Sequence, residues 1–323
     1  MVAKKLERDD GPDERDFLRP LDRDAFRPLE PTVEKVSVGC SLKPREWERL
    51  AALMSERPAV DLHIWSDATA GDLKFLQLFP FLKRLRVELY WNTVRRIGEQ
   101  LPANLQWLWL VAQRNSRMSM AELSALGKLR TFALEGQVKE FERIAALPRI
   151  ERLWIQSVTL PNLQALVPLS KLKWLAIKLG GTSNLAHLGD LRRLEYLELW
   201  RISGPTDLSE LARCAALREV FLDQLRHVRK LPSLRNCENL TRFCMNGTTN
   251  LLDLRPLTTA PNLREFELSG DAGLNAARLR PLLKVRNLSR VTIHARSKER
   301  AMVAELLPFP DVSQKSLRNR FWR

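Results

Sequence analysis

The sequence is dominated by one apolar pattern that recurs along most of the chain. Six-residue segments with apolar residues at positions one, four and six begin at Leu82, Leu105, Leu129, Ile150, Leu172, Leu194, Leu217, Leu240, Leu263 and Leu288, and weaker copies begin at Val33 and Ala59. From Ala59 to Leu288 the copies recur every 22.9 residues on average. A unit this short cannot bury its apolar face alone, so twelve copies in phase predict stacked repeats. The 323 residues, which by length suggest about two domains, are therefore expected to form one repeat array.

Each repeat is predicted to contain two kinds of local structure. The end of each motif alternates apolar and other residues with a period of two, which is typical of a strand. Apolar residues also recur nine, six and three positions before the six motifs from Leu172 to Leu288, as Leu163, Leu166 and Leu169 do before Leu172. A spacing of three is typical of a 3₁₀ turn. Each repeat is therefore expected to be one short strand and one compact helical return.

This arrangement resembles the leucine-rich repeat, and most closely the short repeats of the internalin and SDS22-like proteins, as in DLRPLTTAPNLREFELSG (253–270). The resemblance covers about residues 33–295. It implies an α/β leucine-rich-repeat solenoid of about 12 repeats, with a parallel β-sheet on the concave face and short 3₁₀ or irregular returns on the convex face. The family often carries Asn three positions after the strand, where this chain has Tyr90, Gln113, Val158, Ile202 and Asp271. The buried backbone groups of the turn must therefore find other partners.

The two ends of the chain are expected to lie outside the repeats. Residues 1–16 have mixed charge and are predicted to be a disordered tail, and residues 17–32 are predicted to cap the first repeat. After the solenoid of residues 33–295, residues 296–323 are predicted to form a C-terminal helical cap and a basic tail, with a short helix at 298–307. The final SLRNRFWR fits a cap, a nucleic-acid contact or a docking tail, and capping is favoured.

Composition excludes several classes of protein. No apolar run resembles a signal peptide or reaches the roughly 18 residues of a transmembrane helix, which predicts a cytoplasmic protein without a transmembrane segment. Four cysteines without CxxC spacing predict reduced thiols. Cys214 and Cys237 occupy the slot of Leu169, so both are predicted to be small core residues rather than redox or metal-binding groups.

The sequence gives little support for catalysis. The four histidines show no zinc-ligand spacing, and no P-loop, GxGxxG or GxSxG segment is present. Cys244 falls on the predicted concave face, but neither its own strand motif nor an adjacent one carries a histidine. We therefore expect no enzyme activity, no catalytic residues, no bound metal and no cofactor.

The predicted concave face is rich in aromatic residues. The third, fifth and seventh motif positions point outward, and over twelve copies they provide 36 sites. Eight of these sites are aromatic, including six of the nine tryptophans: Trp65, Trp107, Trp109, Trp154, Trp174, Tyr196, Trp200 and Phe221. One interpretation is that these rings pack against each other because aromatic residues favour strands. The preferred interpretation is an exposed aromatic strip that binds a protein surface or an extended peptide.

Charge is distributed unevenly over the predicted repeats. The same 36 sites carry seven cations and eight acids, so the concave face is nearly neutral although the whole chain has a net charge of +15. The excess positive charge of the repeats is therefore expected on the edges and the convex side, where it serves solubility or binds an acidic partner, nucleic acid or an anionic membrane. Charged residues predicted to join the aromatic ones in partner binding are Arg84, Arg86, Arg152, Glu198, Glu219, Asp223, Glu265 and Glu267. The acids near the far end of the strip suit a partner with an apolar centre and a basic end.

These observations predict a monomeric, non-catalytic protein–protein recognition module that binds a protein partner on its aromatic concave face. A scaffold, a regulatory subunit and the neutralising partner of a toxin or enzyme all remain open. The second choice is a nucleic-acid-associated protein that uses its basic edges and C-terminal tail.

Overall fold

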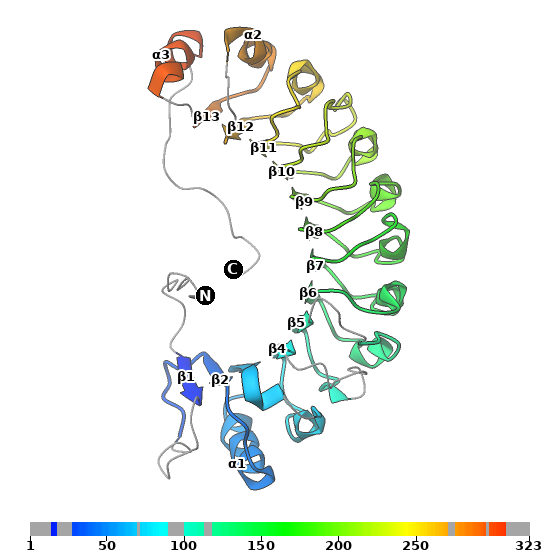
Figure 1. Cartoon of the computed structure of the whole chain (residues 1–323), viewed down its shortest axis with the longest axis vertical. Coiled ribbons are helices and arrows are strands. Elements are labelled where there is room, and N and C mark those ends of the chain that lie inside the picture. The colour runs from blue at the N-terminus through cyan, green and yellow to red at the C-terminus, as the bar shows by residue number, and fades with distance from the viewer. Residues whose placement is uncertain are drawn as a thin grey trace. The chain divides into compact units, whose positions relative to one another are not determined.

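The computed structural model describes residues 14–17, 28–69, 72–89, 100–112, 118–270, 275–294 and 297–307. The chain divides into two compact units, Met1–Val158 and Thr159–Arg323, which we call unit 1 and unit 2 and describe separately. In each unit the strands lie on one side and the helical returns on the other (Figure 1). The strand side of each unit is its concave face.

Each of the twelve motif copies forms a strand that starts at its third position. Unit 1 contains β1 (Glu14–Phe17), β2 (Lys35–Val38), β3 (Asp61–Ile64), β4 (Arg84–Leu89), β5 (Trp107–Ala112), β6 (Thr131–Glu135) and β7 (Arg152–Gln156). Unit 2 contains β8 (Trp174–Lys178), β9 (Tyr196–Trp200), β10 (Glu219–Asp223), β11 (Arg242–Asn246), β12 (Glu265–Ser269) and β13 (Arg290–Ile293). Within each unit successive strands pair in parallel, and equivalent motif positions face each other. The predicted fold class, a leucine-rich-repeat solenoid with a parallel sheet and short 3₁₀ returns, is confirmed.

Most returns are short 3₁₀ turns, as the spacing of three predicts. In unit 1 they are η2 (Ser66–Thr69), η3 (Lys74–Leu78), η5 (Leu123–Leu126) and η6 (Phe141–Ala146). In unit 2 they are η7 (Gln164–Leu166), η8 (Leu188–Asp190), η9 (Ser209–Arg213), η10 (Arg255–Thr259) and η11 (Arg280–Lys284), with a short α-helix, α2 (Ala276–Leu279), before η11. The first return differs, because it is a full helix, α1 (Pro44–Ser55), whose Trp47 stacks on Phe75 of η3 with ring centroids 3.8 Å apart.

A short polar side chain precedes many of the returns. Ten positions before the first motif residue, the side-chain oxygen accepts a hydrogen bond from the backbone N–H two residues later, which starts the turn. This contact is made by Asp72, Ser119, Asn162, Asn184, Asp207 and Asp253. The repeat therefore has a start signal outside its apolar pattern.

The strands end in a left-handed turn rather than in an asparagine ladder. The residue after the strand has a positive φ in the repeats of β6 to β12: Gly136, Ser157, Leu179, Arg201, Gln224, Gly247 and Gly270. Within unit 2, the N–H of Leu179, Arg201, Gln224 and Gly247 donates to the last strand residue of the next repeat, at 2.6–2.8 Å. The slot where the family often carries Asn holds Val158, Ile202 and Leu225, which are buried.

Asparagines form a ladder at a different position, directly before the motif. Asn104, Asn239, Asn262 and Asn287 each donate from Nδ2 to a backbone carbonyl of the preceding repeat at 2.6–3.1 Å. Neighbouring repeats are thus joined at both ends of the strands, by side chains at the entrance and by the backbone at the exit.

Apolar motif residues fill the space between strands and returns. Leu85, Leu108, Leu153, Leu197 and Phe243, all at the fourth motif position, are completely buried. Cys214 and Cys237 are buried and form no disulfide, which confirms that they are core residues. Their thiols donate to the backbone carbonyls of Glu210 and Leu211.

The chain ends are described in part. β1 pairs with β2, so Glu14, Arg15 and Asp16, which were expected in the disordered tail, lie in a strand that crosses the expected boundary at residue 16. The expected C-terminal helix is α3 (Ser297–Leu306), whose following residue Leu307 is buried. The rest of the tail, most of the 17–32 cap and SLRNRFWR lie outside the described residues. Among the described helices, none has the length and apolar character needed to cross a bilayer.

Candidate functional site

The predicted binding residues lie on the strand side of each unit, which is its concave face. The strand register aligns the third, fifth and seventh motif positions of neighbouring repeats, so their side chains form rows across the strands. Unit 1 carries Trp65, Arg84, Arg86, Trp107, Trp109, Arg152 and Trp154, and unit 2 carries Trp174, Tyr196, Glu198, Trp200, Glu219, Phe221, Asp223, Glu265 and Glu267.

In unit 1, guanidinium groups lie over tryptophan rings. Arg86 Cζ is 3.6 Å from the ring centroid of Trp109, and Trp109 meets Trp154 edge to face at 5.8 Å between centroids. Arg84 Cζ lies 4.8 Å from the ring centroid of Trp107. A cation held over an aromatic face is attracted by the electron density of the ring, so these pairs fix the orientation of the rings.

The cations of unit 1 also bind carboxylates. Arg84 Nε is 2.8 Å from Asp61, whose pKa is nevertheless raised because burial outweighs the neighbouring guanidinium. Arg86 forms an ion pair with Glu88. Each of these arginines therefore joins an acid to an aromatic ring.

A buried polar chain crosses the first strands of unit 1. Ser37 Oγ lies 3.0 Å from His63 Nδ1, and His63 Nε2 lies 3.0 Å from Glu88 Oε1. These residue types also form catalytic triads, but the Ser37 side chain is only 2% exposed and offers no surface to a substrate. We interpret the chain as a structural link between strands. Sequence reasoning missed it, although the three residues stand at outward positions of consecutive motif copies.

In unit 2, aromatic rings stack across three adjacent strands. Trp174 and Tyr196 are nearly parallel, with centroids 4.6 Å apart and planes 6° apart, and Phe221 follows at 5.2 Å from Tyr196. Arg242 Cζ lies 5.5 Å from the Phe221 ring centroid. Burial, followed by the Glu198 carboxylate, raises the pKa of the Tyr196 hydroxyl, so this group is a neutral hydrogen-bond donor.

Acidic side chains surround the aromatic stack of unit 2. Glu198 pairs with Lys178 at 2.8 Å, and Lys178 Nζ lies 5.5 Å from the Trp200 ring centroid. Arg242 contacts Glu267 at 3.3 Å and Glu265 at 3.9 Å. The outward positions of unit 2 carry more acids than cations, namely Glu198, Glu219, Asp223, Glu265 and Glu267 against Lys178, Arg242 and Arg290. The concave face of unit 2 is therefore acidic.

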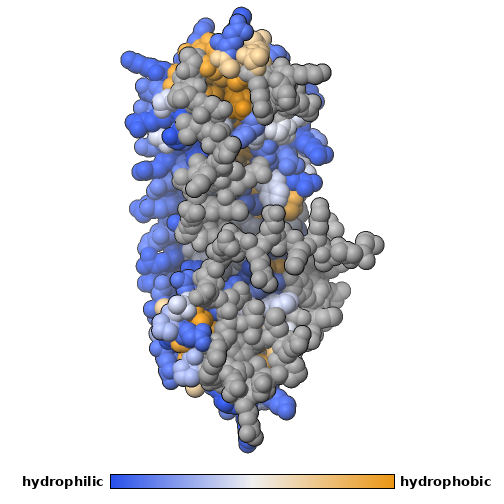
Figure 2. All heavy atoms as spheres, turned by 90° about the vertical axis from the view of Figure 1, so that its left-hand side faces the viewer, coloured by the Kyte–Doolittle hydropathy of each residue, from blue (hydrophilic) through white to orange (hydrophobic). Residues whose placement is uncertain are grey.

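The expectation of six exposed tryptophans is wrong. Trp154 and Trp174 are only 6% and 8% exposed, and Trp65, Trp107, Trp109 and Trp200 are intermediate. The large apolar side chains that are exposed in the described part of the chain are all aliphatic, and hydrophilic residues predominate along the margins in Figure 2. Contacts between the rings, the alternative interpretation of the sequence, account for part of the aromatic enrichment.

Cys244 is also buried rather than exposed. Its thiol lies 3.3 Å from Arg242 Nε and 3.7 Å from Glu267. Burial raises the pKa of the thiol to about 12, so the sulfur is protonated and a poor nucleophile at neutral pH.

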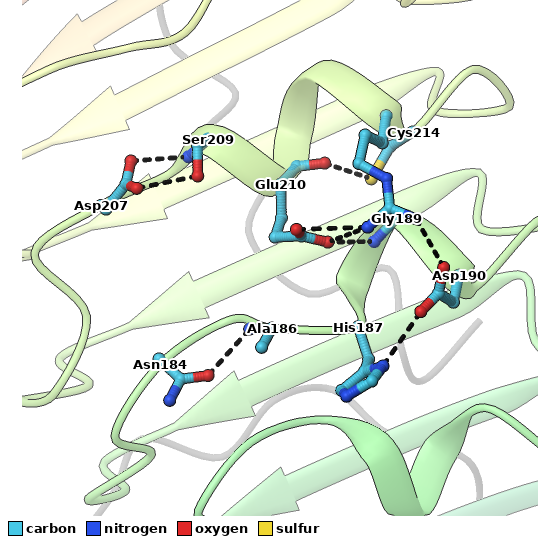
Figure 3. Close-up of polar contacts among 10 residues, drawn as sticks. Asn184, Ala186, His187, Gly189, Asp190, Asp207, Ser209, Glu210 and Cys214 are labelled. Atoms are coloured by element: carbon cyan, nitrogen blue, oxygen red, sulfur yellow. Dashed lines mark hydrogen bonds and ion pairs between the residues drawn. The ribbon is translucent and has the colours of Figure 1, made fainter.

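A polar cluster on the returns of unit 2 links η8 to η9 (Figure 3). Asp190 contacts His187 Nδ1 at 3.0 Å and Arg213 at 2.7 Å, and Arg213 also pairs with Glu210 at 3.0 Å. Glu210 accepts a hydrogen bond from the N–H of Gly189. The hydrogen bond with His187, followed by Arg213, lowers the pKa of Asp190. The cluster holds two returns together.

The described residues contain no cluster of three or more histidine, cysteine or acidic side chains that is able to hold a metal ion. The concave groups of each unit form rows of touching rings and ion pairs.

Comparisons with known proteins agree with this architecture. The sequence matches no protein-family model and no curated protein sequence. The structure is similar to that of an internalin (inlF) from Listeria monocytogenes, with a TM-score of 0.58 and 16% identity over 91% of this chain and 90% of that chain. A leucine-rich-repeat protein from Leptospira interrogans matches with a TM-score of 0.55 and 18% identity, over 82% of this chain and 75% of that one. TLR13, in its complex with ssRNA13, matches with a TM-score of 0.55 and 15% identity, over 81% of this chain and 39% of that one. The chain therefore has the leucine-rich-repeat fold in an internalin-like form.

Proposed function

We propose that this protein is a non-catalytic recognition module that acts in the cytoplasm and binds a protein partner on its concave face. The observation that carries the proposal is the aromatic and arginine contact surface of each unit. Arg86 lies over Trp109 in unit 1, and Tyr196 stacks with Trp174 in unit 2. Trp, Tyr and Arg are the residue types most enriched where protein interfaces concentrate their binding energy.

Ordering of these side chains before binding supports this role. A side chain already held by a ring or an ion pair loses little conformational freedom when a partner arrives, so less of the binding energy is lost to entropy. The tryptophans that remain partly exposed, among them Trp107, Trp109 and Trp200, can contact a partner without rearrangement.

The acidic concave face of unit 2 indicates the chemistry of the partner. Carboxylates of Glu219, Asp223, Glu265 and Glu267 flank the stack of rings. A segment with an apolar residue for the rings and Lys or Arg residues beside it complements this surface. We therefore propose a basic, partly apolar protein segment as the ligand of unit 2.

Affinity capture with matched variants tests the proposal. The concave variant combines Trp107→Ala, Trp200→Ala and Phe221→Ala. The control variant carries Leu252→Ala and Leu283→Ala, two exposed leucines of which the first precedes η10 and the second lies in η11. Circular dichroism and thermal unfolding establish that both variants are folded. We expect a partner captured from native lysate by the wild type and the control to be lost from the concave variant. If the folded concave variant keeps every captured protein, the proposal is wrong.

A second measurement locates the contact on the surface. Hydrogen exchange of the purified complex is expected to protect β5 in unit 1 or β9 and β10 in unit 2. Protection confined to the returns contradicts the proposal.

A further inference from the structure

Exposed cations lie in the turns that lead into four strands of unit 2 and together form a row. Lys171 and Lys173 precede β8, Arg192 and Arg193 precede β9, Arg218 precedes β10, and Arg264 precedes β12. All six residues are exposed, and we call them the basic row. The row lies at the edge where the strands begin and therefore differs from the concave surface described above.

Backbone hydrogen bonds fix the spacing of the row. The N–H of Glu195 donates to the carbonyl of Lys173, and the N–H of Arg218 donates to the carbonyl of Glu195. The same ladder continues from Thr241 to Arg218 and from Arg264 to Thr241. Lys173, Arg218 and Arg264 thus recur at every second strand, about 10 Å apart.

Few acids balance these charges. Glu195 lies 3.4 Å from both Lys173 and Arg218 and is shared between them. Glu238 is the other carboxylate on the turns of this edge, before β11. Lys171, Arg192, Arg193 and Arg264 form no salt bridge with a described residue. Their charges are therefore not neutralised by an ion pair within the described residues.

We propose that the basic row is a docking surface for the phosphate backbone of a nucleic acid. A line of like charges at regular intervals complements a line of phosphates, and each neutralised phosphate releases bound counterions. A pocket for a single small anion needs cations that converge on one point, whereas these six residues are distributed over the starts of several strands. Peripheral membrane binding combines cations with inserted apolar side chains, whereas the exposed large apolar residues of the described part of unit 2 are single residues spread along the unit, namely Val167, Leu179, Leu252 and Leu283.

The test uses the full chain and a matched control. The row variant carries Lys171→Gln, Arg192→Gln and Arg193→Gln. The control variant carries Arg226→Gln, Arg229→Gln and Lys230→Gln, three exposed cations in the loop that follows β10. Both variants lose the same charge from the same unit and keep the same chain ends.

Fluorescence anisotropy measures binding to random-sequence single-stranded RNA and duplex DNA between ~50 and ~200 mM salt. We expect the wild type and the control to bind, and the row variant to bind about tenfold or more weakly at low salt. The slope of log affinity against log salt is expected to become shallower by about two in the row variant. Each phosphate contact contributes about 0.7 to 0.9 to the steepness of this slope, and the variant removes three cations.

The proposal is wrong if the wild type does not bind nucleic acid at low salt, or if the row variant binds with unchanged affinity. It is also wrong if the control variant loses as much affinity as the row variant. Tighter binding of the wild type to anionic vesicles or to polyglutamate than to nucleic acid contradicts it as well. The concave variant is expected to bind nucleic acid as the wild type does, which separates this proposal from the proposed function.

Discussion

The guanidinium of Arg86 lies 3.6 Å from the centre of the Trp109 ring while it also pairs with Glu88. One side chain thereby joins a buried carboxylate to an aromatic surface. Because Glu88 also contacts His63, the arginine balances a carboxylate that is only 8% exposed.

We expect Arg86→Ala to destabilise the protein. Loss of the ring contact alone costs about 1 kcal/mol, and the carboxylate left without its cation adds to this loss. The control is Arg84→Ala, because Arg84 lies farther from its ring, at 4.8 Å, and is more exposed. Urea unfolding measures both variants, and an equal loss in the two contradicts the role assigned to Arg86.

A methyl group at Gly204 is predicted to be incompatible with the packing of unit 2. The Cβ of an alanine there overlaps the backbone oxygen of Thr182. We expect Gly204→Ala to lower the free energy of unfolding by about 3 kcal/mol. In Gly127→Ala the nearest atom, Ser124 O, is 4.0 Å from the new Cβ, so little change is expected. Thermal unfolding of the two variants measures the difference, and similar midpoints would show that the close approach at Gly204 is absent.

At the left-handed positions after the strands, a change to glycine and a change from glycine are expected to shift the free energy of unfolding in opposite directions. Arg201 has a φ of 49°, so Arg201→Gly is expected to raise the free energy of unfolding by up to about 1 kcal/mol. Gly270 has a φ of 70°, and an added Cβ lies 2.5 Å from Asn246 Oδ1, so Gly270→Ala is expected to destabilise. Equilibrium denaturation measures both signs, and a stable Gly270→Ala variant would contradict the assigned turn.

The buried thiols predict a defined response to pH. Burial raises the pKa of Cys214 to about 12, of Cys237 to about 11 and of Cys244 to about 12. Iodoacetamide at pH ~8 is therefore expected to label these cysteines only after denaturation, since it reacts with the thiolate. Peptide mass spectrometry measures the labelling, and rapid modification of Cys244 in the native protein would contradict its burial.

The same pKa values affect stability at high pH. The unfolded thiols ionise near the ordinary value of 9.0, whereas the folded thiols stay protonated to higher pH. The unfolded state is therefore favoured progressively as pH rises above 9.0, and stability is lost up to the folded pKa of about 12. Replacing Cys244 with Ala is expected to flatten this part of the stability profile. Urea unfolding at a series of pH values measures the profile, and an identical slope in the two proteins would contradict the raised pKa.

The strand positions could be predicted from the sequence because a residue pattern with a period of two fixes which side chains point inward. Leu85 and Leu108 are buried and Arg84 is exposed, as that pattern requires. The burial of Cys214 and Cys237 could be predicted for the same reason, because the equivalent position holds apolar residues in the neighbouring repeats.

The turns and the burial of the rings could not be predicted in the same way. Leu179 and Arg201 adopt left-handed conformations that neither residue type favours, and the N–H of each donates to a carbonyl of the next repeat, a contact that local sequence does not specify. The exposure of Trp154 and Trp174 depends on their surroundings across the sheet, which motif position does not specify. The chain from Ser37 through His63 to Glu88 joins residues one repeat apart and becomes visible only when the motif copies are aligned.

The hydrogen bonds that close the turns after the strands connect each repeat to the next one along the chain. In unit 2 the turns after β8 to β11 are each closed by a carbonyl of the following repeat, so one repeat supplies the acceptor that its predecessor needs. Insertion or deletion of a whole repeat keeps this pairing of donor and acceptor. The chain is therefore suited to grow and shrink by duplication and loss of complete repeats, with its parallel sheet lengthened or shortened one strand at a time.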